Sequence, residues 1–302
     1  YVGATEGGLD RDELRQLLPP AHQAFVDDIL QRFGVPDLPE GERPRGMSMN
    51  VSPAGYEPLL DIAFAHPIRL IASALGPPPA DVIDRARAAN GKVGALAGTT
   101  AHAVKHAEAG ADIIVAQGSE AGGHTGEVGT MVLVPEVVDA VSPVPVLAAG
   151  GIASGRHMAA AMALGAAGIW TGSVWLTTAE AETEPVVKQK FLAATSSDTV
   201  RSRSITGKPA RMLRTPWTDE WEREDSPKPL PMPLQPLLVG AALNRINRSA
   251  TTPGSGAHEL ATYFVGQVVG SINTVRPADR VVVQIVEEFI DTLTALSGHL
   301  DV

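Results

Sequence analysis

Cysteine is absent from the 302 residues of the sequence, and aromatic side chains make up only 4% of it. The absence of cysteine excludes disulfides, thiolate-bound metals and cysteine nucleophiles. The sequence also lacks an apolar run that could cross a bilayer, because glycines interrupt its Ala-rich stretch at 157–170. The sequence does not open with the positively charged segment and apolar run of a secretory signal peptide. We therefore expect a soluble, cytoplasmic protein without a membrane partner.

Positive charge is also scarce, and the net charge is −10. Such a chain is repelled by phosphate backbones, which argues against a nucleic-acid partner. The most basic stretch, RSRSITGKPARMLR at 201–214, is followed almost at once by the acidic run TDEWERED at 218–225. We interpret the basic stretch as a solvated loop.

Short apolar runs without polar alternation recur in the middle of the sequence, which is typical of strands buried on both faces. They begin near Lys92, Asp112, Val144 and Ala167, at intervals of 20, 32 and 23 residues. Each interval leaves room for a crossover helix, so the pattern predicts βα units and a parallel sheet. Upstream, 61–78 supplies one or two further strands.

Helices are also expected before and after this array in the sequence. Two lie near the start, before a loop at 36–46, and one ends at Gly91. After Thr206 comes a stretch with seven prolines in 30 residues, followed by three helical segments. The predicted helices are 10–18, 23–34, 80–91, 237–249, 257–273 and 278–297. We expect an α/β barrel over 1–206 and a helical lid or subdomain over 207–302, packed on the barrel.

Glycines gather where three of the predicted strands end, in QGSEAGGHTG (117–126), AAGGIASG (148–155) and TGS (171–173). Ligands of parallel βα arrays bind at the carboxyl ends of the strands, and free N–H groups there attract phosphate. If the last two strands are neighbours, these junctions predict a phosphate site. The alternative is that the glycines only close tight turns.

The segment 117–126, followed by PVLAAGGIASGRHMAAAMALGAAGIWTGSVWL at 145–176, resembles the nitronate monooxygenase family, formerly called 2-nitropropane dioxygenases. The resemblance is specific over 92–180, weaker over 60–91, and returns in VGQVVGSINTVRPA at 265–278. It implies a TIM (β/α)8 barrel that binds FMN. The family also includes a flavin enoyl-ACP reductase.

The resemblance implies roles for individual residues. Gln117, Gly122 and Gly123 are expected against the flavin, and His124 toward the substrate. Gln267 is expected nearest the pocket on the lid. Ala149 is expected to bind the cofactor, and the residues expected to hold the FMN phosphate are Gly150, Gly151, Gly172 and Ser173.

Two family features are missing from this sequence, a first strand reading like PIVQAPM and a third reading like GVNLF. Residues 2–18 resemble the end of the second strand and its helix. The N-terminal barrel strands are therefore expected to be incomplete, which leaves unpaired sheet edges.

The resemblance implies an oxidoreductase that acts on nitronates or nitroalkanes with oxygen. His124 is the candidate base, because imidazole titrates near neutral pH, and the alternative is a histidine that fills the turn. We expect Glu120 to be structural. Two other functions remain open: an NAD(P)H-linked flavoenzyme acting on a CoA or ACP thioester, and a flavin-free phosphate-binding module.

A metal site is weakly indicated. His102 and His106 stand four residues apart, which is the spacing of a zinc pair on one helix face. No glutamate follows the first histidine as in HExxH, and no third ligand is identified, so we expect no metal. The partner is expected to be a small-molecule substrate, and a homodimer is possible.

Overall fold

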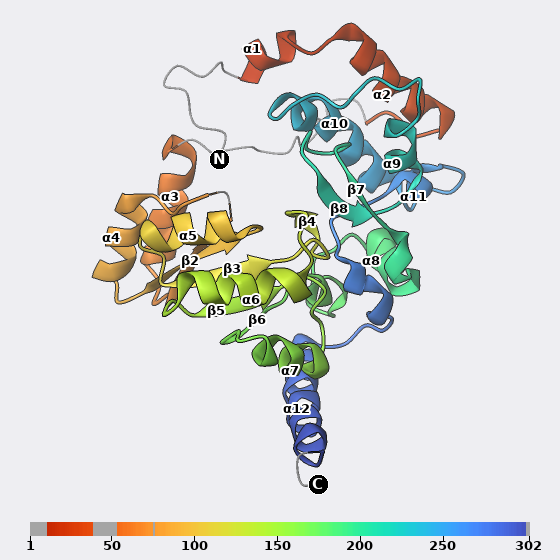
Figure 1. Ribbon diagram of the computed structural model, residues 1–302. Helices are drawn as coiled ribbons and strands as arrows, with labels where there is room; N and C mark the ends of the chain where they lie inside the picture. The colour runs from red at the N-terminus through yellow and green to blue at the C-terminus, as the bar shows by residue number, and fades with distance from the viewer. Residues whose placement is uncertain (1–10, 39–52, 75, 300–302) are drawn as a thin grey trace.

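A computed structural model describes residues 11–38, 53–74 and 76–299. Its centre is a five-stranded sheet in which every neighbouring pair is parallel, with the order β1-β2-β3-β5-β6 (Figure 1). The strands are β1 Leu70–Ser73, β2 Lys92–Ala97, β3 Ile113–Gln117, β5 Val146–Ala149 and β6 Gly168–Trp170. The four strands predicted from the apolar runs are confirmed.

Helices connect these strands in the expected crossovers. They are α4 Ala80–Ala88, α5 Thr100–Glu108, α6 Thr130–Val141 and α7 Gly155–Ala163. Small side chains such as Ala95, Ala116 and Ala148 are fully buried in the sheet, where they let the helices approach closely. Thr99 and Ser154 cap α5 and α7 with their side-chain oxygens.

The upstream segment differs from expectation in two details. Residues 61–78 hold one strand, β1, because their first part completes the helix α3, Pro53–Phe64. The helix α4 ends before Gly91, and the left-handed residue after it is Asn90, with φ of 54°. Asparagine tolerates this conformation better than most side chains, so it replaces the predicted glycine stop.

A second sheet of three antiparallel strands corrects the interpretation of 201–214 as a solvated loop. Its order is β4-β8-β7, with β4 Gly123–His124, β7 Thr199–Ser202 and β8 Ala210–Leu213. All four residues of β8 are buried. The prediction was wrong because basic residues usually lie in solvent, whereas Arg211 is itself buried in β8.

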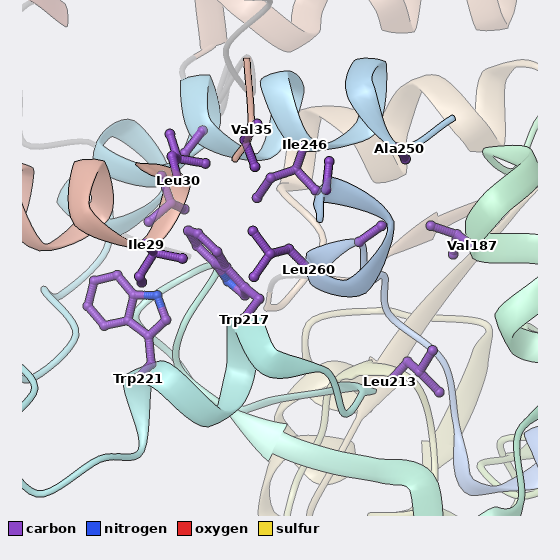
Figure 2. Packing of buried hydrophobic residues seen from close by; sticks show 14 of the residues in the cluster. Ile29, Leu30, Val35, Val187, Leu213, Trp217, Trp221, Ile246, Ala250 and Leu260 are labelled. Atoms are coloured by element: carbon purple, nitrogen blue, oxygen red, sulfur yellow. The ribbon is translucent and has the colours of Figure 1, made fainter. Parts of the chain in front are cut away.

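Tryptophans and aliphatic side chains form a second core beside this hairpin (Figure 2). Trp217 is fully buried, and Trp221, Ile29, Ile246 and Leu260 surround it. The helices that supply this core are α2 Pro20–Arg32, α8 Pro185–Ala193, α9 Pro216–Trp221, α10 Leu234–Ser249 and α11 Ala257–Leu260. The N-terminal helix α2 thus packs on the C-terminal helix α10 (Figure 1).

Short helices complete the described chain. They are α1 Arg11–Gln16 and the 3-10 helices η1 Ser173–Thr177, η2 Ser196–Asp198 and η3 Gln267–Ser271. The predicted continuous helix at 257–273 is therefore wrong, since α11 and η3 are separated by an extended segment. The predicted loop at 36–46 and the strand resemblance at 2–18 fall largely outside the described residues.

The last helix, α12 Ala278–Ser297, packs against α7 (Figure 1). A side chain at Gly155 would collide with the backbone of Phe289, so glycine permits this close approach. Val281 and Ile285 are buried, but Val282, Leu293 and Leu296 are exposed. Among the described residues, one apolar face of α12 is therefore exposed to solvent. No helix in the described part of the chain is long and apolar enough to cross a membrane.

Candidate active site

Two of the glycine-rich junctions lie side by side at the carboxyl edge of the parallel sheet. Strands β5 and β6 are direct neighbours, and Ala149 is in register with Trp170. Gly150 and Gly151 follow β5, while Gly172 and Ser173 follow β6. The structure thus brings together the residues predicted to bind phosphate.

Backbone geometry explains why glycine occupies these positions. Gly150 and Gly151 have φ of 98° and 68°, a region that side chains disfavour. A side chain at Gly150 would also stand 2.8 Å from Oγ1 of Thr130. At Gly172 a side chain would meet no atom within 4 Å. The N–H groups of Gly151 and Gly172 have no hydrogen-bond acceptor in the described part of the chain, so this cradle fits a phosphate group.

The third glycine-rich junction joins the same edge. Gln117, the last residue of β3, is in register with Ala149, and N–H of Gly118 donates to the carbonyl of Ala149 at 2.9 Å. Gly123 has φ of 77° and open space where a side chain would begin. Gly122 differs, because a side chain there would stand 2.8 Å from the backbone nitrogen of Gly266.

The C-terminal segment is attached to this turn by its backbone. The N–H of Gln267 donates to the carbonyl of Glu120 at 2.9 Å. The N–H of Gly266 donates to Oγ of Ser173 at 2.8 Å, so the hydroxyl of Ser173 serves a protein contact. The residues predicted on the lid thus lie against the glycine-rich turn.

His124 is exposed at the end of this turn, on the two-residue strand β4. Its Nδ1 lies 3.2 Å from the carbonyl oxygen of Pro209. A carbonyl only accepts hydrogen bonds, so the neutral ring carries its proton on Nδ1 and presents the Nε2 lone pair. The ring of Phe264 lies beside it, with centroids 6.5 Å apart. His124 can therefore accept a proton from a bound molecule.

Glu120 holds the turn to the start of helix α6. Its carboxylate accepts hydrogen bonds from N–H of Thr130 at 3.0 and 3.1 Å and from Oγ1 of Thr130 at 2.9 Å. A carboxylate at a helix N-terminus is favoured by the free N–H groups and the helix dipole. This arrangement supports the predicted structural role.

Sequence reasoning missed Arg211, which is buried beside the turn. Its Nε donates to the carbonyl of Ser119 at 3.0 Å and its Nη1 to Oγ1 of Thr199 at 3.1 Å. Burial lowers the pKa of Arg211, Arg201 lowers it further, and Glu120 opposes both effects. The alternation of arginine with apolar residues in 199–213 was the signal that could have revealed a strand pair.

The histidines at 102 and 106 do not form a metal pair. His106 is buried, and its Nε2 donates to the carbonyl of Leu96 at 3.0 Å. Burial lowers the pKa of His106, and the hydrogen bond to Leu96 only partly opposes this. His102 is exposed on the surface of α5. Within the described ranges, no group of three metal-binding side chains occurs.

Several known proteins are similar to this chain. A Mycobacterium tuberculosis protein whose name describes a monooxygenase is 66% identical over 99% of this chain and 80% of its own length. A Bacillus subtilis protein named as a nitronate monooxygenase is 32% identical over 76% of this chain and 67% of its own length. A Rhodococcus jostii carboxyl-CoA dehydrogenase is 37% identical over 70% of this chain but only 57% of its own.

Solved structures agree on the fold. FabK from Thermotoga maritima is 31% identical and superposes with a TM-score of 0.68, covering 97% of this chain and 86% of its own. A nitroalkane oxidase from Streptomyces ansochromogenes is 24% identical and superposes with a TM-score of 0.77, covering 96% and 80%. The α/β TIM-barrel class predicted from the sequence is thereby confirmed.

The nitronate monooxygenase family matches residues 41–288, which hold the parallel sheet, the three glycine-rich junctions and His124. This range covers most of the chain, and it includes the segments on which the sequence resemblance rested. The chain therefore belongs to the nitronate monooxygenase family of flavin-dependent oxidoreductases.

Proposed function

We propose that this protein is an FMN-dependent monooxygenase that oxidises nitronates and nitroalkanes with oxygen. The observation that carries the proposal is the Nε2 lone pair of His124, which is exposed on a glycine-rich turn at the carboxyl edge of the sheet. The names of its relatives support the nitronate substrate.

The glycine cradle is the part of the site that would hold FMN. Free N–H groups at Gly151 and Gly172 suit a phosphate, and the open face of Gly123 suits the approach of a flat ring. Gln117 and Ala149, at the ends of paired strands, would border the ring. When bound, the flavin supplies an acceptor for the substrate's electrons, which oxygen then removes.

His124 acts on the substrate rather than on the cofactor. A neutral nitroalkane must lose the proton on the carbon next to its nitro group, and Nε2 is the atom that accepts it. The hydrogen bond to Pro209 keeps the proton of the neutral ring on Nδ1 and orients the imidazole. A preformed nitronate has already lost its proton and does not need this base.

The segment after Thr206 is proposed to border the site as a lid. Its β8 strand pairs with β4, and its residues 266 and 267 contact the glycine-rich turn through backbone hydrogen bonds. Gln267 is the side chain of this segment that we place nearest the substrate.

A second candidate function is supported by two relatives, at 37% and 36% identity, that are named as dehydrogenases of a carboxyl-CoA compound. On this alternative the protein would use NAD(P)H and a CoA or ACP thioester. The family resemblance covers both reactions, and the arrangement of His124 is compatible with either.

The test has three outcomes. Purified protein is scanned for flavin absorbance, then supplied with propane-2-nitronate while dissolved oxygen is recorded, and separately with NAD(P)H under anaerobic conditions. Oxygen uptake with the nitronate supports the proposal. Flavin bleaching by NAD(P)H without nitronate-dependent oxygen uptake supports the thioester alternative. Protein that neither contains nor takes up FMN overturns both and leaves a phosphate-binding module.

A further inference from the structure

Two arginines oppose each other across the β7–β8 hairpin. Arg201 and Arg211 are in register on neighbouring antiparallel strands, so their side chains leave the sheet on the same face. Both reach the glycine-rich turn. The Nε of Arg211 donates to Ser119, and Nη2 of Arg201 lies 3.5 Å from the carbonyl oxygen of Thr125. Two positive charges are therefore held against one loop.

These two charges lack a partner of opposite sign. Among the described residues, neither guanidinium forms an ion pair with a carboxylate. Glu120 attracts Arg211 from a greater distance, but its carboxylate is already occupied by Thr130. Like charges directly opposite each other destabilise a strand pair, so the hairpin carries a cost that an anion would relieve.

Hydrogen-bond donors of the pair are also unused. The Nε of Arg201 is buried without a hydrogen-bond partner in the described part of the chain. Arg211 is only 9% exposed and uses Nε and Nη1, which leaves its Nη2 without an acceptor among the same residues. A buried donor without a partner costs stability. Gly123, in register with Arg211, has open space where a side chain would begin.

We propose that Arg201 and Arg211 form a subsite for an oxyanion, a carboxylate, nitronate or phosphate group, beside the glycine-rich turn. A guanidinium binds two oxygens of such a group with parallel hydrogen bonds, which suits the unused donors of this pair. The subsite lies along β4, the strand that carries His124, and not on the β5 and β6 junctions that form the cradle. On the proposed function, on which this assignment rests, the subsite takes a charged group of the substrate.

Simple anions test the subsite without any turnover. Acetate and inorganic phosphate are titrated by calorimetry at constant ionic strength into the purified full chain, saturated with FMN so that phosphate does not bind in the glycine cradle. Arg201→Gln and Arg211→Gln should each weaken anion binding by about 10- to 100-fold, the effect of losing a charge-assisted hydrogen bond. Arg203→Gln is the matched control, since Arg203 is an exposed cation of the same hairpin, and it should change affinity by less than about twofold.

The same titrations identify the chemistry of the group. Tighter binding of acetate indicates a planar oxyanion such as a carboxylate or nitronate, and tighter binding of phosphate indicates a phosphorylated substrate. Equal loss in all three variants would mean general attraction by the basic hairpin and would overturn the proposal. Failure of both anions to bind the unaltered protein would overturn it as well.

Thermal stability separates a ligand site from a purely structural pair. If the pair awaits an anion, Arg201→Gln relieves repulsion at the loss of one long contact, and the free protein melts at the same or a higher temperature. A lower melting temperature with unchanged anion affinity would show that the arginines only anchor the hairpin, which overturns the proposal. Arg201→Lys and Arg211→Lys keep the charge but not the planar fork, so they provide a second pair of variants with partial loss of affinity. None of these outcomes depends on nitronate oxidation.

Discussion

The imidazole of His124 is oriented by the backbone of Pro209, whose carbonyl oxygen lies 3.2 Å from Nδ1. Pro209 immediately precedes β8, and β8 is paired with the strand that carries His124. The hairpin therefore fixes both the position of the ring and the nitrogen that carries its proton. The other ring nitrogen, Nε2, is free to accept a hydrogen bond or a proton from a molecule bound beside the turn.

Replacement of His124 by alanine should slow oxidation of neutral 2-nitropropane by about 10² to 10⁴, the usual contribution of a positioned base. Oxidation of preformed propane-2-nitronate should fall much less, because its proton is already gone. The two kcat/KM values are measured by oxygen uptake, with flavin content as the control. Because His124 is exposed, little packing is lost, and the variant should retain its flavin.

Equal losses on the two substrates would mean that His124 positions the substrate instead of removing a proton. Full activity on both would return His124 to the role of a residue that fills the turn. That second outcome would also remove the observation on which the nitronate assignment rests.

Gly151→Leu and Gly172→Leu should each abolish retention of FMN. Gly151 adopts a left-handed φ of 68°, and Gly172 leaves open the space in which a phosphate would lie. Gly34→Leu is the matched control, because Gly34 has a φ of 58° and lies after helix α2, away from the cradle. Bound flavin is measured by absorbance after gel filtration. Retention by both cradle variants at the level of the control would contradict the site assignment.

Glu120→Ala should lower the free energy of unfolding by about 1–2 kcal/mol, because the N–H of Thr130 at the start of α6 loses its acceptor. Urea denaturation measures the change. Glu127→Ala removes an exposed carboxylate from the same turn and should have little effect. A similar loss in both variants would show that net charge, and not the contact with Thr130, is responsible.

Stability should fall as the solution is acidified below about pH 6.5, and His106 should contribute to this fall. Burial lowers the pKa of His106 in the folded protein, so the unfolded chain binds more protons as the pH drops below the ordinary histidine value. The stabilisation is present above that value and is lost as the pH falls through the lowered pKa. His106→Phe should flatten this limb of the stability curve, measured by thermal melts between about pH 5 and 8.

Gln267→Ala should change KM several-fold while leaving flavin content unaltered, since the proposed contact of Gln267 is with the substrate. Its backbone N–H still donates to Glu120 in the variant, so the segment stays attached to the turn. Steady-state kinetics with propane-2-nitronate and a bulkier nitronate would measure the effect. Identical KM values for both substrates in the variant and the parent would place this side chain outside the pocket.

The parallel sheet could be predicted because its evidence is local. Each buried strand is a short apolar run, and two of the crossover helices, α5 and α7, begin at capping residues, Thr99 and Ser154. The glycine junctions could be placed at the strand ends for the same reason. The homodimer stays a prediction.

The rest of the site depends on contacts between distant parts of the chain. No local pattern indicates that Gly122 lies against Gly266, or that Pro209 reaches His124. The pairing of Arg201 with Arg211 was hidden because a basic segment is usually solvated, and only the hairpin reveals its buried face. The burial of apolar residues on α12 could not be predicted for the same reason. The periodic pattern shows which residues share a helix face, but not whether another element packs against that face.

The parallel sheet and the helices around Trp217 have separate apolar cores, and the pairing of β4 with β8 joins the glycine-rich turn to the β7–β8 hairpin. Proteins open in cooperative units that follow such cores, each with its own free energy of opening. Amide hydrogen exchange should therefore divide the chain into a slowly opening sheet unit and a helical unit with different protection. A ligand that touches both sides of the boundary would raise the protection of both units together, so exchange would report occupancy of the site without any measurement of catalysis.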